Sequence, residues 1–219
     1  INAQNYQLAI EKLEQAIKLD PSYKNARANL AIAYNNYGLV FQNNPMEAIK
    51  YFHKAVLLDA NNATTLQNLS GIIEKMGKNP RVFADRVAIG DACRKAADFV
   101  GAIVEYQEAL KIKDDGPLHE KLGDVFRVRD ENDKAIEQYQ LIKLEPHFKS
   151  SPGKQDVHIG RCLVELKQYK KALPYLNSAM TSGVTFELLQ LRARTLDALG
   201  DKAGAAKDRA KIKAIEADF

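Results

Sequence analysis

The chain has 219 residues, of which 27% are charged and 46% hydrophobic, and a formal net charge of +4. With two cysteines and no apolar run of roughly 20 residues, it is neither a disulfide-built secreted scaffold nor a membrane-spanning chain, and its composition excludes global disorder. The mild charge does not by itself indicate a nucleic-acid partner, and the absence of Trp with only 12 Gly favours helices over a sheet-rich barrel.

Hydrophobic periodicity and capping signals predict twelve helices. In chain order they span residues 4–19, 23–41, 45–58, 62–77, 81–97, 99–112, 117–129, 132–144, 153–167, 169–181, 184–199 and 202–217. Asn44 and Pro45 supply a capping residue and a first-turn proline for the third helix. Gly77, Gly183 and Gly200 are typical of helix ends or tight turns.

Two side-chain patterns alternate along these helices. A first-type helix carries a large apolar residue, a small residue directly after it and a bulky residue three positions on. A second-type helix carries an alanine, an aromatic residue or Leu four positions on, and usually a second alanine three further. Examples of the two patterns are Leu122, Gly123 and Phe126, and Ala48, Phe52 and Ala55. The small residues allow two helices to approach closely, and such pairs must stack on one another to bury a continuous core.

This alternation resembles the tetratricopeptide repeat, a helix pair of about 34 residues with an L-G-x-x-Y … A-x-x-x-F … P signature. The resemblance covers nearly the whole chain. It implies an all-α fold, an α-solenoid in which helix pairs form a right-handed superhelix. It further implies that the first-type helices line a concave groove that binds extended peptides or partner helices.

We expect a single repeat array over residues 1–219. Its predicted parts are a trailing helix of an upstream repeat (1–22), repeats at 23–62, 83–115, 116–149 and 150–183, an irregular segment (63–82), and a C-terminal repeat with a capping helix (184–219). The stretch 37–44 is longer than the repeat period allows, so the second helix should extend farther than a regular repeat helix before the chain turns. Helix 62–77 lacks a partner of its own, so either helix 81–97 serves two units or a segment is missing.

The sequence indicates no catalytic residues, no metal site and no cofactor. Phosphate-binding glycine loops, H-E-x-x-H, C-x-x-C and G-x-S-x-G motifs are all absent from it. His158 and Cys162 lie four residues apart on one predicted helix, but two ligands do not make a metal site, and packing is the favoured role of both.

Candidate peptide-binding residues follow from the predicted groove. In several tetratricopeptide proteins, the position two residues before the small residue of a first-type helix holds an Asn that bonds a peptide backbone. Here that position is occupied by Asn29 and Asn68, and an amide with both donors and an acceptor can bond the N–H and C=O of any peptide. Asn25 and Asn36 extend this uncharged polar stretch. The alternative is that these side chains are simply solvated.

A second candidate set is basic and lies farther along the chain. It consists of Arg94, Lys121, Arg127 and Arg161, which would attract an acidic partner segment. Acidic residues interleave with this set, among them Asp91, Glu120 and Asp124. A solvated face of mixed charge is therefore the favoured interpretation.

These observations favour a non-catalytic scaffold that binds a protein or peptide partner. The alternative is the repeat region of a larger enzyme, for example a transferase, that recruits its protein substrates. We expect no nucleic-acid partner and no membrane span. An apolar edge on helix 4–19 (Leu8, Ile10, Leu13 and Ile17) could support a homo-oligomer, and the unpaired-looking cysteines favour a cytoplasmic location.

Overall fold

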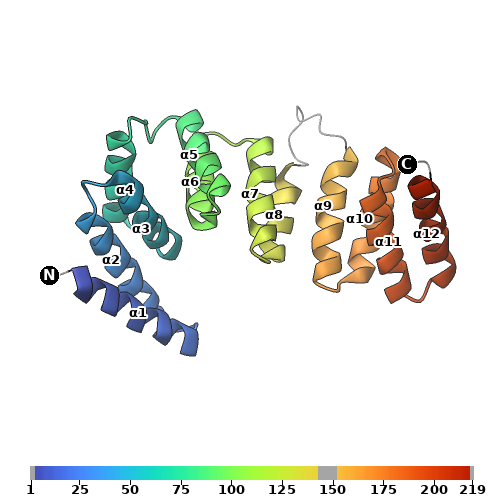
Figure 1. Cartoon of the computed structure of the whole chain (residues 1–219), viewed down its shortest axis with the longest axis horizontal. Helices are drawn as coiled ribbons and strands as arrows, with labels where there is room; N and C mark the ends of the chain where they lie inside the picture. Colours follow the sequence, from blue (N-terminus) through green and yellow to red (C-terminus); the bar gives the residue numbers. More distant parts are fainter. Residues whose placement is uncertain (1–2, 143–151, 218–219) are drawn as a thin grey trace. The chain divides into compact units, whose positions relative to one another are not determined.

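The computed structural model describes residues 3–142 and 152–217, whose regular structure is entirely α-helical (Figure 1). The twelve helices are α1 (Ala3–Leu19), α2 (Lys24–Val40), α3 (Pro45–Leu58), α4 (Ala63–Lys75), α5 (Phe83–Lys95), α6 (Phe99–Ile112), α7 (Gly116–Val128), α8 (Asn132–Ile142), α9 (Pro152–Glu165), α10 (Tyr169–Ser182), α11 (Phe186–Ala198) and α12 (Lys202–Ala217). None of the helices in the described ranges combines the length and apolar character needed to cross a bilayer.

The helix boundaries confirm the periodicity analysis. Every predicted start, and every predicted end but one, lies within two residues of the observed boundary. The exception is the predicted end at residue 144, which lies outside the described residues, as does the expected repeat boundary at 149–150. The long second helix is confirmed as well: α2 has 17 residues, whereas α4, α5, α7 and α11 have 13 each.

Side-chain caps fix several helix starts. Asn62 accepts a hydrogen bond from the Thr65 N–H at 3.0 Å, and Asp98 accepts one from the Gly101 N–H at the same distance. Each satisfies an amide that lacks an intrahelical partner. The expectation for Asn44 was wrong in one respect: it occupies the N-cap of α3, but its side chain makes no capping hydrogen bond. Pro45, whose φ is already helical, marks this start instead.

Five first-type helices end in the same backbone motif. The second residue after each helix has a left-handed conformation. The residue that follows it donates its backbone N–H to the carbonyl of the residue in the bulky position of the first-type pattern of that helix. The left-handed residues, with φ between +57° and +88°, are Gly77, Ala97, Asp130, Lys167 and Gly200. The predictions for Gly77 and Gly200 are confirmed, but three of these positions carry a side chain.

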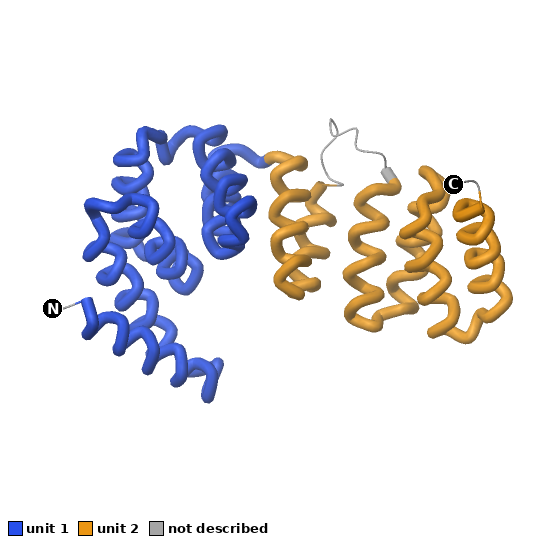
Figure 2. Tube along the Cα trace, viewed as in Figure 1, with its two compact units in different colours: residues 1–114 blue, residues 115–219 orange. Residues whose placement is uncertain are grey.

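The chain divides into two compact units, residues 1–114 and residues 115–219 (Figure 2). In unit 1, α2 packs against α1 and α3, and α5 packs against α6. In unit 2, the pairs α7–α8, α9–α10 and α11–α12 follow one another, and α9 and α11 also contact the second-type helix before them. Each unit is therefore built from stacked helix pairs. A single array over residues 1–219 remains a prediction.

Glycine in a first-type helix permits the close approach that the sequence pattern indicates. A Cβ atom on Gly90 would lie 2.5 Å from the ring of Tyr106, and one on Gly123 would lie 2.6 Å from the ring of Tyr139. Both rings are buried against the glycine of the partner helix. The pairs α5–α6 and α7–α8 therefore use the same ring-on-glycine contact.

Unit 1 departs from a regular stack at α4. This helix packs against α3 and α2, whereas the next helix, α5, pairs with α6, and α6 packs against α3. Ile89 of α5 nevertheless belongs to the same buried cluster as Phe52 of α3 and Leu69 of α4. Helix α5 thus packs against α6 and also contributes Ile89 to the core formed by α3 and α4.

Candidate partner-binding surfaces

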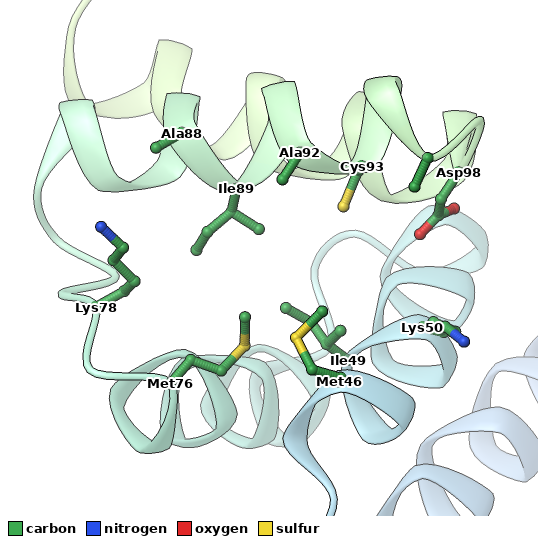
Figure 3. A pocket seen from close by; sticks show the side chains of 11 residues that line it. Met46, Ile49, Lys50, Met76, Lys78, Ala88, Ile89, Ala92, Cys93 and Asp98 are labelled. Carbon is green, nitrogen blue, oxygen red and sulfur yellow. The ribbon is translucent and has the colours of Figure 1, made fainter.

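An apolar cavity of about 260 Å³ lies between α3, the end of α4 and α5 in unit 1 (Figure 3). Met46, Ile49 and Met76 face it from one side, and Ile89 and the small side chains of α5 face it from the other. The complete lining is Met46, Ile49, Lys50, Met76, Lys78, Ala88, Ile89, Ala92, Cys93, Ala96 and Asp98. The cavity lies beside α4, the first-type helix that has no second-type partner following it.

Two lysines that border this cavity are already paired. Lys50 forms an ion pair with Glu47 at 2.8 Å, and Lys78 forms one with Asp85 at 3.3 Å. The two methionines at the wall can adjust their shape, since their side chains are unbranched and flexible. The cavity is thus suited to an apolar side chain or group and not to a strongly charged one.

A buried charged network joins α3, α5 and α6 next to the cavity. His53 Nε2 lies 2.8 Å from Glu105 Oε1, and Arg86 Nη1 bonds both oxygens of Glu105, at 2.9 and 3.1 Å. Burial acts to raise the pKa of Glu105, but the hydrogen bond from His53 and the charge of Arg86 outweigh it and hold this pKa below its ordinary value. Glu105 is therefore an anion in a fully buried position.

The predicted asparagines of unit 1 are only partly brought together. Asn68 Nδ2 donates to Asn35 Oδ1 at 2.9 Å, and Asn35 Nδ2 donates to Asn36 Oδ1 at 3.3 Å, so an amide chain links α4 to α2. Asn25 and Asn29 lie one turn apart on α2 and are exposed. The residue that joins the two helices is Asn35, which the spacing rule did not select because it lies four positions after the small residue of α2.

A groove of about 490 Å³ runs along α4 and includes Asn68. Its lining combines apolar groups with amides and charges, and comprises Leu39, Gln42, Phe52, Gln67, Asn68, Ser70, Gly71, Ile72, Glu74, Lys75 and Arg81. The bond to Asn35 fixes the Asn68 amide at the edge of this groove. An amide held in this way keeps its oxygen and its second N–H for a ligand.

Two members of the basic set take part in a repeated Asp–Tyr–Arg arrangement. The Tyr139 hydroxyl donates to Asp124 at 2.9 Å, and Arg127, one turn after that aspartate, lies 3.7 Å from it and also bonds Tyr139. Arg94 occupies the corresponding position beside Tyr106. These arginines therefore support the helix pairs. A Gly-Asp-x-x-Arg sequence, which occurs in α5 and again in α7, was the signal that could have indicated this.

Arg161, another basic candidate, also lies next to an acidic group. Arg161 forms an ion pair with Glu187 at the edge of a second cavity, of about 380 Å³, in unit 2. Lys154, which lines the same cavity, pairs with Glu120. Lys121 is partly buried on α7. Around Arg161 the surface thus carries both signs of charge.

His158 and Cys162 take the packing positions that the sequence favours. The His158 ring stacks on Tyr139, with centroids 4.8 Å apart, and Cys162 is fully buried. Burial is also the largest effect on both groups, lowering the pKa of His158 and raising the pKa of Cys162 to about 11.

The edge of the first helix is less exposed than the sequence suggests. Ile10 is buried, and Leu13 and Ile17 pack on the core that α1 shares with α2 and α3. Of the four expected edge residues only Leu8 is exposed, at 56%. Self-association through α1 therefore remains a prediction, with a smaller apolar surface than expected.

No family model matches this sequence, and no curated protein matches it. Solved structures do. MamA (residues 41 to the end) from Desulfovibrio magneticus RS-1 is 15% identical with a TM-score of 0.58, and the match covers 86% of this chain and 96% of that one.

Two further structures support the same comparison. YrrB, described as a TPR protein with an unusual peptide-binding site, is 17% identical with a TM-score of 0.52, over 96% of this chain and 95% of that one. The APC/C hetero-tetramer Cut9–Hcn1 is 16% identical with a TM-score of 0.53, over 100% of this chain and 44% of that one. At these identities the likeness concerns the fold, and it shows that this all-α chain has the tetratricopeptide-repeat fold.

Proposed function

We propose that the chain is a non-catalytic scaffold that binds an extended segment of a protein partner along α2 and α4 of unit 1. The observation that carries the proposal is the Asn68 amide, held by Asn35 at the edge of a groove whose lining mixes apolar and polar side chains. A peptide in extended conformation presents unpaired N–H and C=O groups together with side chains. The groove offers an amide for the former and apolar surface for the latter.

Asn29 and Asn25 are the next proposed contacts, since both are exposed on α2. Asn36 has a supporting role, because it accepts a hydrogen bond from Asn35. The basic residues Arg94, Lys121, Arg127 and Arg161 are secondary candidates that would add attraction to an acidic segment. The amides recognise backbone, so the specificity of the proposed site would come from the walls of the groove.

The test uses peptides selected from a random twelve-residue display library on the full chain. We expect wild-type protein to bind selected peptides, and Asn68→Ala combined with Asn29→Ala to weaken that binding about 5- to 30-fold, as the loss of one or two hydrogen bonds of about 1 kcal/mol each predicts. Circular dichroism should show unchanged helicity.

Asn61→Ala is the matched control, because this asparagine is exposed in the turn before α4. It should leave affinity unchanged. Equal affinity of the double variant and wild type would reject the α2–α4 site. Failure of the library to yield any binder would reject peptide binding by this chain.

A further inference from the structure

Three potential metal-ligand atoms converge beside the apolar cavity of unit 1. They are His53 Nδ1 from α3, Cys93 Sγ from α5 and a carboxylate oxygen of Asp98 from the N-cap of α6, and all lie within 4.8 Å of one another. Nitrogen, sulfur and oxygen donors of these kinds are those that Zn²⁺ takes in proteins. Cys93 and Asp98 meet through the turn between α5 and α6, in which the Asp98 N–H donates to the Cys93 carbonyl, whereas His53 is brought to them from α3 by the packing of α6 against α3.

The environment of His53 supplies an independent indication. Its side chain is fully buried, and its Nδ1 atom has no hydrogen-bond partner among the described residues. Its other nitrogen, Nε2, faces the Glu105 carboxylate at 2.8 Å. Because Arg86 bonds both oxygens of Glu105, this carboxylate is an acceptor for a hydrogen bond from Nε2, and Nδ1 is the ring nitrogen that faces Cys93 and Asp98. A carboxylate that orients a histidine in this way is typical of metal-binding histidines.

Asp98 and Gly101 complete the arrangement. Asp98 Oδ1 accepts the capping hydrogen bond from Gly101, so that Oδ2 is the oxygen on the side of His53 and Cys93. A Cβ atom on Gly101 would lie 2.6 Å from Asp98 Oδ2, 2.7 Å from His53 Nδ1 and 2.8 Å from Cys93 Sγ. A side chain at position 101 would therefore force at least one of the three donor side chains to shift.

We propose that His53, Cys93 and Asp98 bind a zinc ion, with a fourth coordination position open towards the cavity that Cys93 and Asp98 line. Three protein ligands leave one position for water or for a donor atom of a bound partner. Binding converts the Cys93 thiol to a thiolate, and its proton leaves to the buffer as the Zn–S bond forms. This site is independent of the proposed peptide groove, and it would join α3, α5 and α6 within unit 1.

The test uses the full chain without an affinity tag, stripped of metal by a chelator and dialysed. Zn²⁺ added in competition with a chromophoric chelator should bind with a stoichiometry of one per chain and raise the melting temperature. Co²⁺ in place of Zn²⁺ should give two absorption signals. One is a thiolate-to-metal charge-transfer band in the near ultraviolet, and the other is the set of visible bands of a four-coordinate cobalt ion.

Cys93→Ser and Asp98→Asn test the ligands, and the asparagine keeps the oxygen that caps α6. Substituting an outer partner of a metal ligand changes affinity about 10- to 100-fold, so we expect each ligand substitution to weaken Zn²⁺ binding at least as much. Cys162→Ser is the control, since this second cysteine is buried in unit 2. Circular dichroism establishes that each variant is folded.

Loss of the near-ultraviolet cobalt band in Cys93→Ser, with the band retained in Cys162→Ser, would support the site. The absence of a one-to-one complex in wild type would overturn the proposal. A folded Asp98→Asn variant with unchanged affinity, or a cobalt spectrum that depends on Cys162, would overturn it as well.

Discussion

The Tyr106 hydroxyl donates a hydrogen bond to Asp91 Oδ1 at 2.6 Å, while the ring of the same tyrosine covers Gly90. Tyr139 repeats both contacts on Asp124 and Gly123 one helix pair later, in the other unit. One side chain therefore makes an apolar and a polar contact with the same turn of its partner helix. This relationship is the unit from which the pairs α5–α6 and α7–α8 are built, and it leads to the first two predictions.

Gly90→Ala should destabilise unit 1 by about 1–3 kcal/mol, because the new methyl group would lie 2.5 Å from the Tyr106 ring and overpack the helix pair. Gly71→Ala in α4 is the matched control. A Cβ atom there meets nothing within 4 Å, so better helix propensity should stabilise the unit by about 0.5–1 kcal/mol. Urea unfolding followed by circular dichroism measures both, and effects of equal sign would contradict the packing argument.

Tyr106→Phe keeps the ring over Gly90 and removes only the hydroxyl. Since the hydrogen bond goes to a charged acceptor, its loss should cost about 1.5–3 kcal/mol. Tyr23→Phe, at a half-exposed position before α2, should leave stability within about 0.5 kcal/mol. Urea midpoints of the two variants provide the comparison, and equal midpoints would show that the Asp91 bond contributes nothing net.

Ala97→Gly should stabilise the chain. Ala97 has φ of +58°, a conformation that costs roughly 1–2 kcal/mol for a residue with a Cβ atom. Because glycine also loses more chain entropy on folding, the expected net gain is about 0.5–1 kcal/mol. Ala28→Gly, on the exposed face of α2, should have the opposite sign. Melting temperatures that fall for both variants would argue against the strain at Ala97.

Glu105→Gln should cost about 3–5 kcal/mol, because it leaves the Arg86 charge buried without its partner. Glu108→Gln, which removes a pair with a solvent-exposed lysine on the same helix, should cost less than about 1 kcal/mol. Chemical denaturation of the two variants at neutral pH measures this difference.

The same network predicts a pH dependence with a definite sign. The folded-state pKa of Glu105 lies below its unfolded value of about 4.5, so the folded state binds the proton more weakly. The stabilisation is therefore complete above that unfolded value and is lost as pH falls through the folded value. Urea midpoints measured between neutral and acidic pH should show this loss in wild type, and the loss should be smaller in Glu105→Gln.

The fold was predictable from sequence because it follows from local patterns. The spacing of Ala48, Phe52 and Ala55, or of Leu122, Gly123 and Phe126, predicts both the helix and the face it buries. Contacts between distant helices were not predictable in this way. His53 and Cys93 each look ordinary in their own helix, and only the packing of α6 against α3 brings them together.

The candidate site was predictable in part for the same reason. The position of Asn68 follows from the repeat pattern, but its partner Asn35 depends on the relative rotation of α2 and α4. The arginines were placed on the correct helices. Their contacts with Tyr106 and Tyr139 depend on rings that the neighbouring helix contributes. The pattern of charges along a single helix does not reveal such contacts.

The contact between α3 and α6 has a consequence for how unit 1 is made. His53 meets Glu105 across 52 positions of sequence, whereas helices in a regular stack meet only their neighbours. During synthesis, α3 and α4 leave the ribosome well before the helix that completes their environment. Until α6 has emerged, the nascent chain holds an imidazole and part of an apolar core in contact with water, because these contacts close only over a long stretch of sequence.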